Sequence, residues 1–506
     1  MVYFKINLFI FNFKLLYIFI NNKNNLRDFI KFNSPKLKTN IVFFFTSVSF
    51  LNLLLIAIYT FGKSIVYEDS FVLLYPGKIN FISWLFKPHN GHIIFLSKLV
   101  TNIFSFFYLN PTGYNIIISI LILLTGIFVI KEIIYNILEN KCFKNLIFYY
   151  CTFIWISPFQ WENLIWEFQF PWFLISLLVL ILTLINLYDL KDKAYNQNYK
   201  KIFFLFSPII AVLSSGQGIC YVFCLLITFI IQSKRNIFAL IGVTISILIF
   251  FNFRENSLII NKVDIFDGIK YLFLISSSIF KPSISSFNRE SIQSWYLPLI
   301  SSFLFNVNSI YFLFRNYKFK FNKHIFSKNI LIITPIIFGL QFSFLTTISR
   351  SQFGYHQGLV SRYFTSLSLI PIGLLILASY IYSSLSNYYE ISNENKKSKE
   401  NLFQFTIYAN IITFLIIINC HSIFKTIYET KITYNYRQRN FAEFIKICKK
   451  NENQEIKNDS QLKKYFENLI IAPSVNKPPL PKANNFYDFK NYLRDDFCKL
   501  TTAYFE

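Results

Sequence analysis

The stretch "IVFFFTSVSFLNLLLIAIYTF" (41–61) holds no charged side chain over its whole length. A helix of about twenty such residues crosses the ~30 Å hydrocarbon core of a lipid bilayer. Similar apolar stretches recur along the 506 residues, of which 54% are hydrophobic and only 15% are charged. The sequence therefore predicts an all-α integral membrane protein that crosses the bilayer many times.

The hydrophobic pattern predicts about eleven transmembrane helices, with 10–13 as the plausible range. Lys and Arg alternate between the connecting loops: one set of alternate loops holds 22 of them in 82 residues, whereas the other set holds 11 in 130. Cytoplasmic loops are enriched in Lys and Arg, so the first set is expected to be cytoplasmic. The expected spans are 41–61, 116–131, 145–157, 172–188, 202–214, 218–232, 237–252, 296–314, 329–347, 364–384 and 402–420.

This alternation requires 92–109 to lie in the membrane interface or to re-enter, because a further crossing there would change the side of every later loop.

The chain is expected to divide into three regions. Residues 1–40 form an N-terminal interfacial or extra helix with a basic cytoplasmic loop, and residues 41–420 form the multi-span domain. Residues 421–506 are polar and predict a small extracytoplasmic domain, in which Cys448 and Cys498 either pair or stay free.

The net charge of +24 raises the question of a nucleic-acid partner. The basic residues gather in short loops between apolar stretches, however, and no basic stripe with stacking aromatics lies in a soluble region. They are better interpreted as topology signals, and no nucleic-acid partner is expected. The seven cysteines show no zinc-binding spacing, and those near the spans are interpreted as small apolar filler.

The loops of the less basic set are rich in polar, aromatic and glycine residues. Each has an ordinary explanation: a solvated loop, a turn, a flanking charge, or an aromatic belt at the lipid headgroups formed by Trp155, Trp161, Trp166 and Trp172. Together, carboxylates, histidines, amides and arginines on one side of a membrane suit a phosphate-bearing lipid substrate, because Arg binds phosphate with a bidentate fork. The stretches are "YEDSF" (67–71), "PHNGHIIFLSKL" (88–99), "SPFQWENLIWEFQFPW" (157–172), "LSSGQG" (213–218) and "SRSQFGYHQGLVSRY" (349–363).

These stretches, with an acidic pair directly after the first long span, resemble bacterial integral-membrane glycosyltransferases of the GT-C superfold. The resemblance covers most of residues 41–365. It implies a GT-C fold with interfacial helices in the first outer loop, a polyprenyl-phosphate-linked sugar donor, a glycan or lipid acceptor, and inverting transfer. It also implies location in a bacterial inner membrane, among membrane lipids, with an active site that faces the periplasm or exterior.

The resemblance also implies roles for particular residues. Asp69 is the expected catalytic base with Glu68 beside it, and Arg362 and Arg350 are the expected ligands of the donor phosphate. A basic residue is expected directly after His92, but Ile93 stands there, so either Lys98 supplies that charge or the site is weakened. The expected substrate-binding residues are His89, Asn90, His92, Glu162, Asn163, Gln169 and Gln217.

Other functions fit the same residues. A transporter or flippase for lipid-linked oligosaccharides would share the arginines and aromatics, but it would also place ionisable residues inside spans and show internal repeats. A polysaccharide polymerase or an acyltransferase of the cell envelope would use the same residue types on the outer face. No cofactor is required for sugar transfer, although Glu68 and Asp69 leave room for a divalent metal.

Overall fold

The structure, a computed structural model, describes residues 35–60, 73, 80–89, 92–105, 111–139, 141–166, 169–190, 197–231, 237–253, 265–277, 332–351 and 361–392. Most of these residues are helical, and none of them belongs to a strand. The single β-type pairing in this part of the chain is an isolated bridge between His89 and His92. The prediction of an all-α protein is therefore confirmed for the described residues.

Long helices make up most of the described structure. They are α3 (Pro35–Thr60), α6 (Pro111–Ile137), α7 (Lys141–Trp155), α9 (Phe170–Leu190), α10 (Gln197–Ser214), α11 (Gly218–Ile231), α12 (Ile237–Asn252), α16 (Thr334–Arg350) and α18 (Leu369–Ser392). The shorter elements are α4 (Phe81–Phe86), α5 (Phe95–Ser105), η2 (Pro158–Gln160), α8 (Trp161–Ile165), α13 (Ile265–Ser277), η6 (Ser361–Tyr363) and α17 (Phe364–Leu367).

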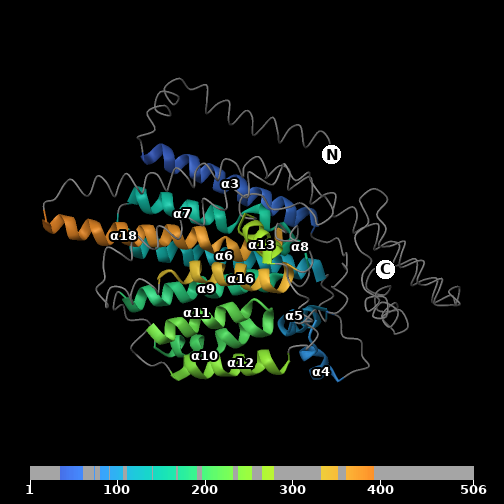
Figure 1. Ribbon diagram of the computed structural model, residues 1–506. Helices are drawn as coiled ribbons and strands as arrows, with labels where there is room; N and C mark the ends of the chain where they lie inside the picture. The colour runs from blue at the N-terminus through green and yellow to red at the C-terminus, as the bar shows by residue number, and fades with distance from the viewer. Residues whose placement is uncertain are drawn as a thin grey trace, which may run out of the picture.

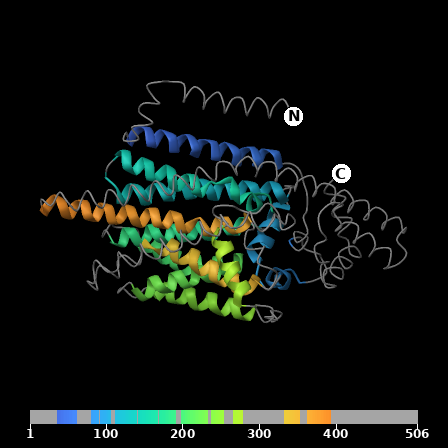
Figure 2. The same ribbon diagram turned by 45° about the horizontal axis from the view of Figure 1, so that its top comes forward.

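The long helices lie roughly side by side in one bundle (Figure 1). Helix α3 packs on α7, α6 packs on α7 and α9, and α16 packs on α18, while α10, α11 and α12 contact one another at the far side of the bundle. The same order is visible in the turned view (Figure 2). The short helices α4, α5 and α8 lie at the end of the bundle drawn on the right of Figure 1.

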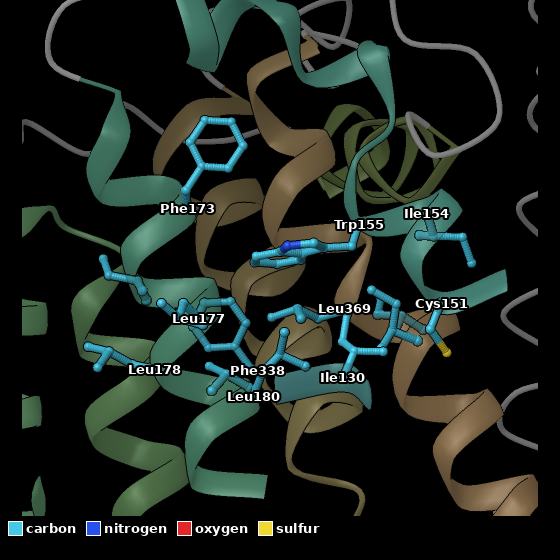
Figure 3. Close-up of a cluster of buried hydrophobic side chains, with 14 of the residues drawn as sticks. Ile130, Cys151, Ile154, Trp155, Phe173, Leu177, Leu178, Leu180, Phe338 and Leu369 are labelled. Atoms are coloured by element: carbon cyan, nitrogen blue, oxygen red, sulfur yellow. The ribbon is translucent and has the colours of Figure 1, made fainter. Parts of the chain in front are cut away.

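A continuous apolar core holds these helices together. Figure 3 shows side chains from five helices meeting in one cluster: Ile130 of α6, Trp155 of α7, Phe173 of α9, Phe338 of α16 and Leu369 of α18. The Trp155 side chain is fully buried, and its Nε1–H donates to the Leu123 carbonyl over 2.8 Å. Trp161 and Trp166 are also buried. An aromatic belt facing the lipid is therefore the wrong interpretation for these three tryptophans.

Nine of the predicted spans coincide with helices of the structure, α3, α6, α7, α9, α10, α11, α12, α16 and the pair α17–α18. The predicted spans 296–314 and 402–420, residues 1–34 and the C-terminal domain 421–506 with both of its cysteines lie outside the described residues. Within the described part, two helical segments, Gly113–Ile137 and Phe170–Leu190, are long and apolar enough to cross a membrane. This supports association with a membrane, and the number of eleven spans stays a prediction.

Helix α12 shows a pattern opposite to that of a helix on the surface of a soluble protein. Its small residues Ala239, Gly242 and Ser246 are buried together with Val243, whereas six of its large apolar residues are exposed. At Gly242, an added Cβ would lie 2.6 Å from the Leu205 carbonyl oxygen of α10. Small residues at contacts between helices are typical of membrane-embedded bundles. The exposed residues of α12 are Ile237, Leu240, Ile241, Ile245, Leu248 and Phe251.

Two further elements bear on the loops that were predicted to lie outside the membrane. Helix α5 covers the stretch 92–109 in part and has 11 residues, about 16 Å of helix, which is too short to cross ~30 Å of hydrocarbon. Helix α13 lies in the segment 253–295, which the hydrophobic pattern predicts as a plain loop. With 13 residues and a polar first turn, α13 is too short and too polar to be predicted as a membrane span. The hydrophobic pattern therefore did not indicate this helix.

Buried cysteines in the bundle agree with their interpretation as apolar filler. Cys151, Cys220 and Cys224 are free thiols with almost no exposed surface. Cys224 lies against α16, where its thiol is 3.6 Å from Gln341 Oε1.

Candidate functional site

The backbone of Arg362 is held by two neighbouring side chains of α8. A carboxylate oxygen of Glu162 accepts a hydrogen bond from the Arg362 N–H at 3.0 Å, and the side-chain amide of Asn163 donates to the Arg362 carbonyl at 2.8 Å. The same amide donates to the Thr365 hydroxyl at 2.7 Å. The stretches "WEN" and "SRY", about 200 residues apart in the chain, therefore form one unit that fixes Arg362.

Both α8 residues were predicted to bind substrate. In the structure, Asn163 is fully buried and its amide hydrogens are used within the protein, and one carboxylate oxygen of Glu162 is engaged with backbone. Their observed contacts are with Arg362 and with Thr365 next to it in α17. The structure therefore gives them a role in positioning an arginine, a role that the sequence alone did not indicate.

The guanidinium group of Arg362 lies among aromatic rings. It is 5.4 Å from the ring centroid of Trp166 and 5.7 Å from that of Tyr363. The Tyr363 ring packs in turn on Trp172 and Phe342, at 5.9 and 5.8 Å between centroids. Contact with aromatic faces stabilises a guanidinium group and restricts its motion. Arg362 is therefore held both at its backbone and at its side chain.

A second arginine, Arg350 at the end of α16, lies against His92. Its Nη2 is 3.5 Å from Nε2 of the histidine. The other edge of the His92 ring covers Gly216, where an added Cβ would lie 2.4 Å from Nδ1. Because Gly216 of "LSSGQG" has no side chain, it leaves the space that His92 occupies beside Arg350. Three of the polar stretches meet at this point.

Tyr271 of α13 joins the two arginines into one site. Its hydroxyl donates to the Tyr363 hydroxyl at 3.2 Å, and its side chain has no exposed surface. Burial and the nearby Tyr363 raise the pKa of Tyr271, whereas the positive charges of Arg362 and Arg350 oppose that shift. The positive charges of both guanidinium groups therefore favour the ionised form of one buried hydroxyl. No sequence motif pointed to Tyr271.

The amide residues of the site form a second layer around α17. Gln217 accepts a hydrogen bond from the Ser366 hydroxyl at 2.6 Å, and Gln160 accepts one from Thr365 at 2.9 Å. Gln217 and Gln169 are buried, and each has one side-chain atom, Nε2 and Oε1 respectively, without a partner among the described residues. A buried polar atom without a partner costs about 1–3 kcal/mol, so each is a candidate contact for a ligand hydroxyl.

Asn115, near the start of α6, fixes the segment between α8 and α9. Its side-chain amide donates to the Leu164 carbonyl at 2.7 Å, and its oxygen accepts from the Phe170 N–H at 3.1 Å. The residue is fully buried. Sequence reasoning missed it because a single Asn in an apolar helix carries no pattern. Its contacts hold the α8 end from which Glu162 and Asn163 reach Arg362.

Lys98 does not supply the positive charge that was expected beside His92. Its ammonium group donates to the carbonyls of Trp84 and Lys87 at 2.8 and 2.7 Å, which closes the C-terminal end of α4. It also lies 5.0 Å from the centre of the Trp84 ring. Burial, and then the charge of Lys87, lower the pKa of Lys98 to about 8. The residue fixes the corner between α4 and α5.

His89 is half-buried, and its backbone exchanges two hydrogen bonds with that of His92, at 2.8 and 2.9 Å. The bridge fixes the start of α5 and the direction of His92. Asp69, Glu68 and Asn90 lie outside the described residues. Among the described residues, no three side chains of the types His, Cys, Asp and Glu gather as metal ligands would.

Fold and site define a helical bundle with two membrane-span candidates and a cluster of two arginines, a histidine and aromatic residues at one end. Comparison of the chain with models of protein families, with curated proteins and with solved structures gave no match. The GT-C likeness therefore rests on the sequence motifs described above.

Proposed function

We propose that this protein is a multi-pass membrane glycosyltransferase that moves a sugar from a polyprenyl-phosphate carrier to an envelope glycan or lipid. One observation carries the proposal: Arg350 and Arg362, from one stretch of the chain, lie at an end of the helical bundle where His92, from a distant stretch, contacts Arg350. Guanidinium groups bind phosphate in preference to neutral groups, and a lipid carrier presents its phosphate at the membrane boundary. The proposal includes about eleven spans, of GT-C type, with the small domain 421–506 on the outer side.

In the proposed mechanism, the two arginines hold the phosphate of the donor. The acceptor hydroxyl oxygen attacks the anomeric carbon from the side opposite the phosphate, and its proton passes to the carboxylate of Asp69. The bond between the anomeric carbon and the phosphate oxygen breaks, and the polyprenyl phosphate leaves with the electron pair. The arginines stabilise the negative charge that grows on this phosphate. The configuration at the anomeric carbon is inverted.

The surrounding residues have supporting roles in this proposal. Glu162 and Asn163 position Arg362 through its backbone. Gln217 and Gln169 offer buried polar atoms to the hydroxyls of the sugar. Glu68 modulates Asp69, and His89 fixes the backbone of His92. No metal takes part in any step as proposed.

The test is transfer from labelled polyprenyl-phosphate sugars by membranes that carry each variant. Arg362→Lys keeps the charge but loses the fork, so transfer should weaken by roughly 1.5–3 kcal/mol, and Arg362→Ala should lose more. Asp69→Asn should lower turnover by roughly 10²–10⁴ with unchanged expression, whereas Glu68→Gln should do less. Lys201→Ala, exposed at the start of α10, is the control and should transfer as the wild type does.

Full activity of Arg362→Ala would contradict the proposal. Glycan analysis of a strain that lacks the gene separates the alternatives. Loss of one sugar branch supports transfer, whereas accumulation of lipid-linked units with every linkage intact points to a polymerase or a flippase.

A further inference from the structure

The two tyrosine side chains near Arg362 are unusual because both are buried and their hydroxyls meet. Tyr271 has no exposed side-chain surface and Tyr363 is 3% exposed. Their hydroxyls are 3.2 Å apart, with Tyr271 as the donor. Within the described part of the chain, this is the one hydrogen bond of the Tyr363 hydroxyl, so its own hydrogen stays available to an acceptor.

The surroundings favour an anion as that acceptor. The Arg362 guanidinium lies 5.7 Å from the Tyr363 ring, and the charges of Arg362 and Arg350 both act on Tyr271. Arg362 is positively charged and lies beside the Tyr363 ring, so an anion bound by Arg362 lies within the neighbourhood of the free Tyr363 hydrogen. Hydrogen bonds to ionised groups are about twice as strong as those between neutral groups.

We propose that Tyr363 is a third ligand of the anion that Arg362 and Arg350 hold, donating its hydroxyl hydrogen to a phosphate oxygen, and that Tyr271 is a positioning residue which acts through it. Because Tyr271 donates to the Tyr363 oxygen, the Tyr363 hydrogen turns toward the phosphate. This inference rests on the proposed function, since it assigns a ligand to the same phosphate. The packing of α13 on α16 brings Tyr271 to this end of the bundle.

The experiment measures thermal stabilisation of the purified full-length protein in detergent by geranyl phosphate, a short prenyl monophosphate, with geraniol as the uncharged control. Tyr363→Phe should raise the concentration needed for half-maximal stabilisation by roughly 10- to 100-fold, as expected for loss of a hydrogen bond to an anion. Tyr271→Phe should raise it by several-fold. The double variant should match Tyr363→Phe alone, because a residue that acts through another adds nothing once that residue is gone.

The matched control is Tyr221→Phe. Tyr221 is also fully buried, and its hydroxyl donates to Ser207 at 2.9 Å between α11 and α10. It should lower the melting temperature without changing the response to geranyl phosphate. A response of Tyr363→Phe equal to that of the wild type overturns the inference, as do additive effects of the two tyrosines.

The outcomes separate this inference from the proposed function. If Arg362→Ala abolishes the stabilisation while Tyr363→Phe leaves it unchanged, the phosphate site stands and the role of the tyrosines is wrong. If the wild type responds equally to geraniol and geranyl phosphate, there is no phosphate site and both proposals fail.

Discussion

Single residues at the site act mainly by placing other residues. Glu162 and Asn163 contact the backbone of Arg362, and Gly216 leaves room for the ring of His92. The sequence marks these residues as peculiar, because carboxylates, amides and glycines are costly or unusual near apolar segments. It does not reveal whether such a residue touches a substrate or a neighbour. Only the contacts between distant segments separate the two roles.

Gly216→Ala tests whether the position of His92 matters. The new Cβ would lie 2.4 Å from the imidazole Nδ1, so the ring must move, and its contact with Arg350 is lost. We expect transfer to fall by roughly tenfold or more while the protein still folds, because the clash is with the end of a side chain. Transfer assays and thermal unfolding of the same sample measure both effects.

Gly218→Ala is the contrasting variant, because its Cβ would lie 2.0 Å from the backbone carbonyl oxygen of Ala211. It should lower expression or the melting temperature. If both variants transferred sugar at the wild-type rate, the close packing of "LSSGQG" would have no bearing on the site.

At the scale of elements, the corner between α4 and α5 depends on the buried ammonium group of Lys98. Its pKa is lowered to about 8, chiefly by burial. Between about pH 8 and the usual lysine pKa near 10.4, the unfolded chain binds more protons than the folded chain, so the free energy of unfolding rises with pH in this window. The gain is absent below about pH 8, where Lys98 is protonated in both states.

Lys98→Met removes this titrating group, so the free energy of unfolding of the variant should no longer rise with pH in this window. We expect the melting temperature of the wild type to increase relative to that of Lys98→Met between pH 8 and 10, as measured by thermal unfolding in detergent. Lys270→Met, in an exposed pair with Asp267, should follow the wild-type profile. Parallel profiles of the wild type and Lys98→Met would contradict the lowered pKa.

The packing of α12 on α10 depends on a missing side chain. Gly242→Ala would place a Cβ 2.6 and 2.7 Å from the carbonyl oxygens of Leu205 and Phe204, which belong to backbone and cannot rotate away. We expect a destabilisation of about 1–3 kcal/mol, the usual cost of overpacking. Leu248→Ala, on the outward face of the same helix, should cost far less. Denaturation in detergent compares the two, and equal effects would contradict the close contact.

At the scale of the whole molecule, the polar site and the basic loops lie at different ends of the helices. Arg350 and Arg362 lie where α16 ends and where η6 leads into α17. Lys144 lies 4.7 Å from the Tyr135 ring at the junction of α6 and α7, and Lys200 pairs with Asp189 at the junction of α9 and α10. This division agrees with the charge asymmetry of the loops.

Topology labelling tests the division directly. Single cysteines at Lys87 and Asn198, both exposed, should react with a membrane-impermeant thiol reagent from opposite sides of the membrane. Lys87 is expected on the outer side with the site. Asn198 is expected on the cytoplasmic side, as is Lys320, which lies between the expected spans 296–314 and 329–347. Cells and broken membranes labelled in parallel provide the readout. Labelling of Lys87 and Asn198 from the same side would contradict the predicted alternation.

The sequence by itself determined the helical class and the positions of nine long helical segments, because a helix satisfies all of its backbone hydrogen bonds within one long apolar stretch. It also indicated which loops are unusual. Helix α13, with Tyr271, escaped detection because its apolar stretch is short. The buried states of Trp155, Trp161 and Trp166 escaped because an aromatic pattern does not distinguish lipid from protein neighbours.

Only the tertiary structure decided which residues meet. Hydrogen bonds between "WEN" and "SRY", the contact of Arg350 with His92 and the pair Tyr271–Tyr363 all join segments more than ninety residues apart. Such contacts depend on how helices pack, which follows from the shapes of whole helix surfaces and from small residues such as Gly242. Hydrophobic periodicity along the chain indicates which face of each helix is buried. It does not indicate which helix packs on that face.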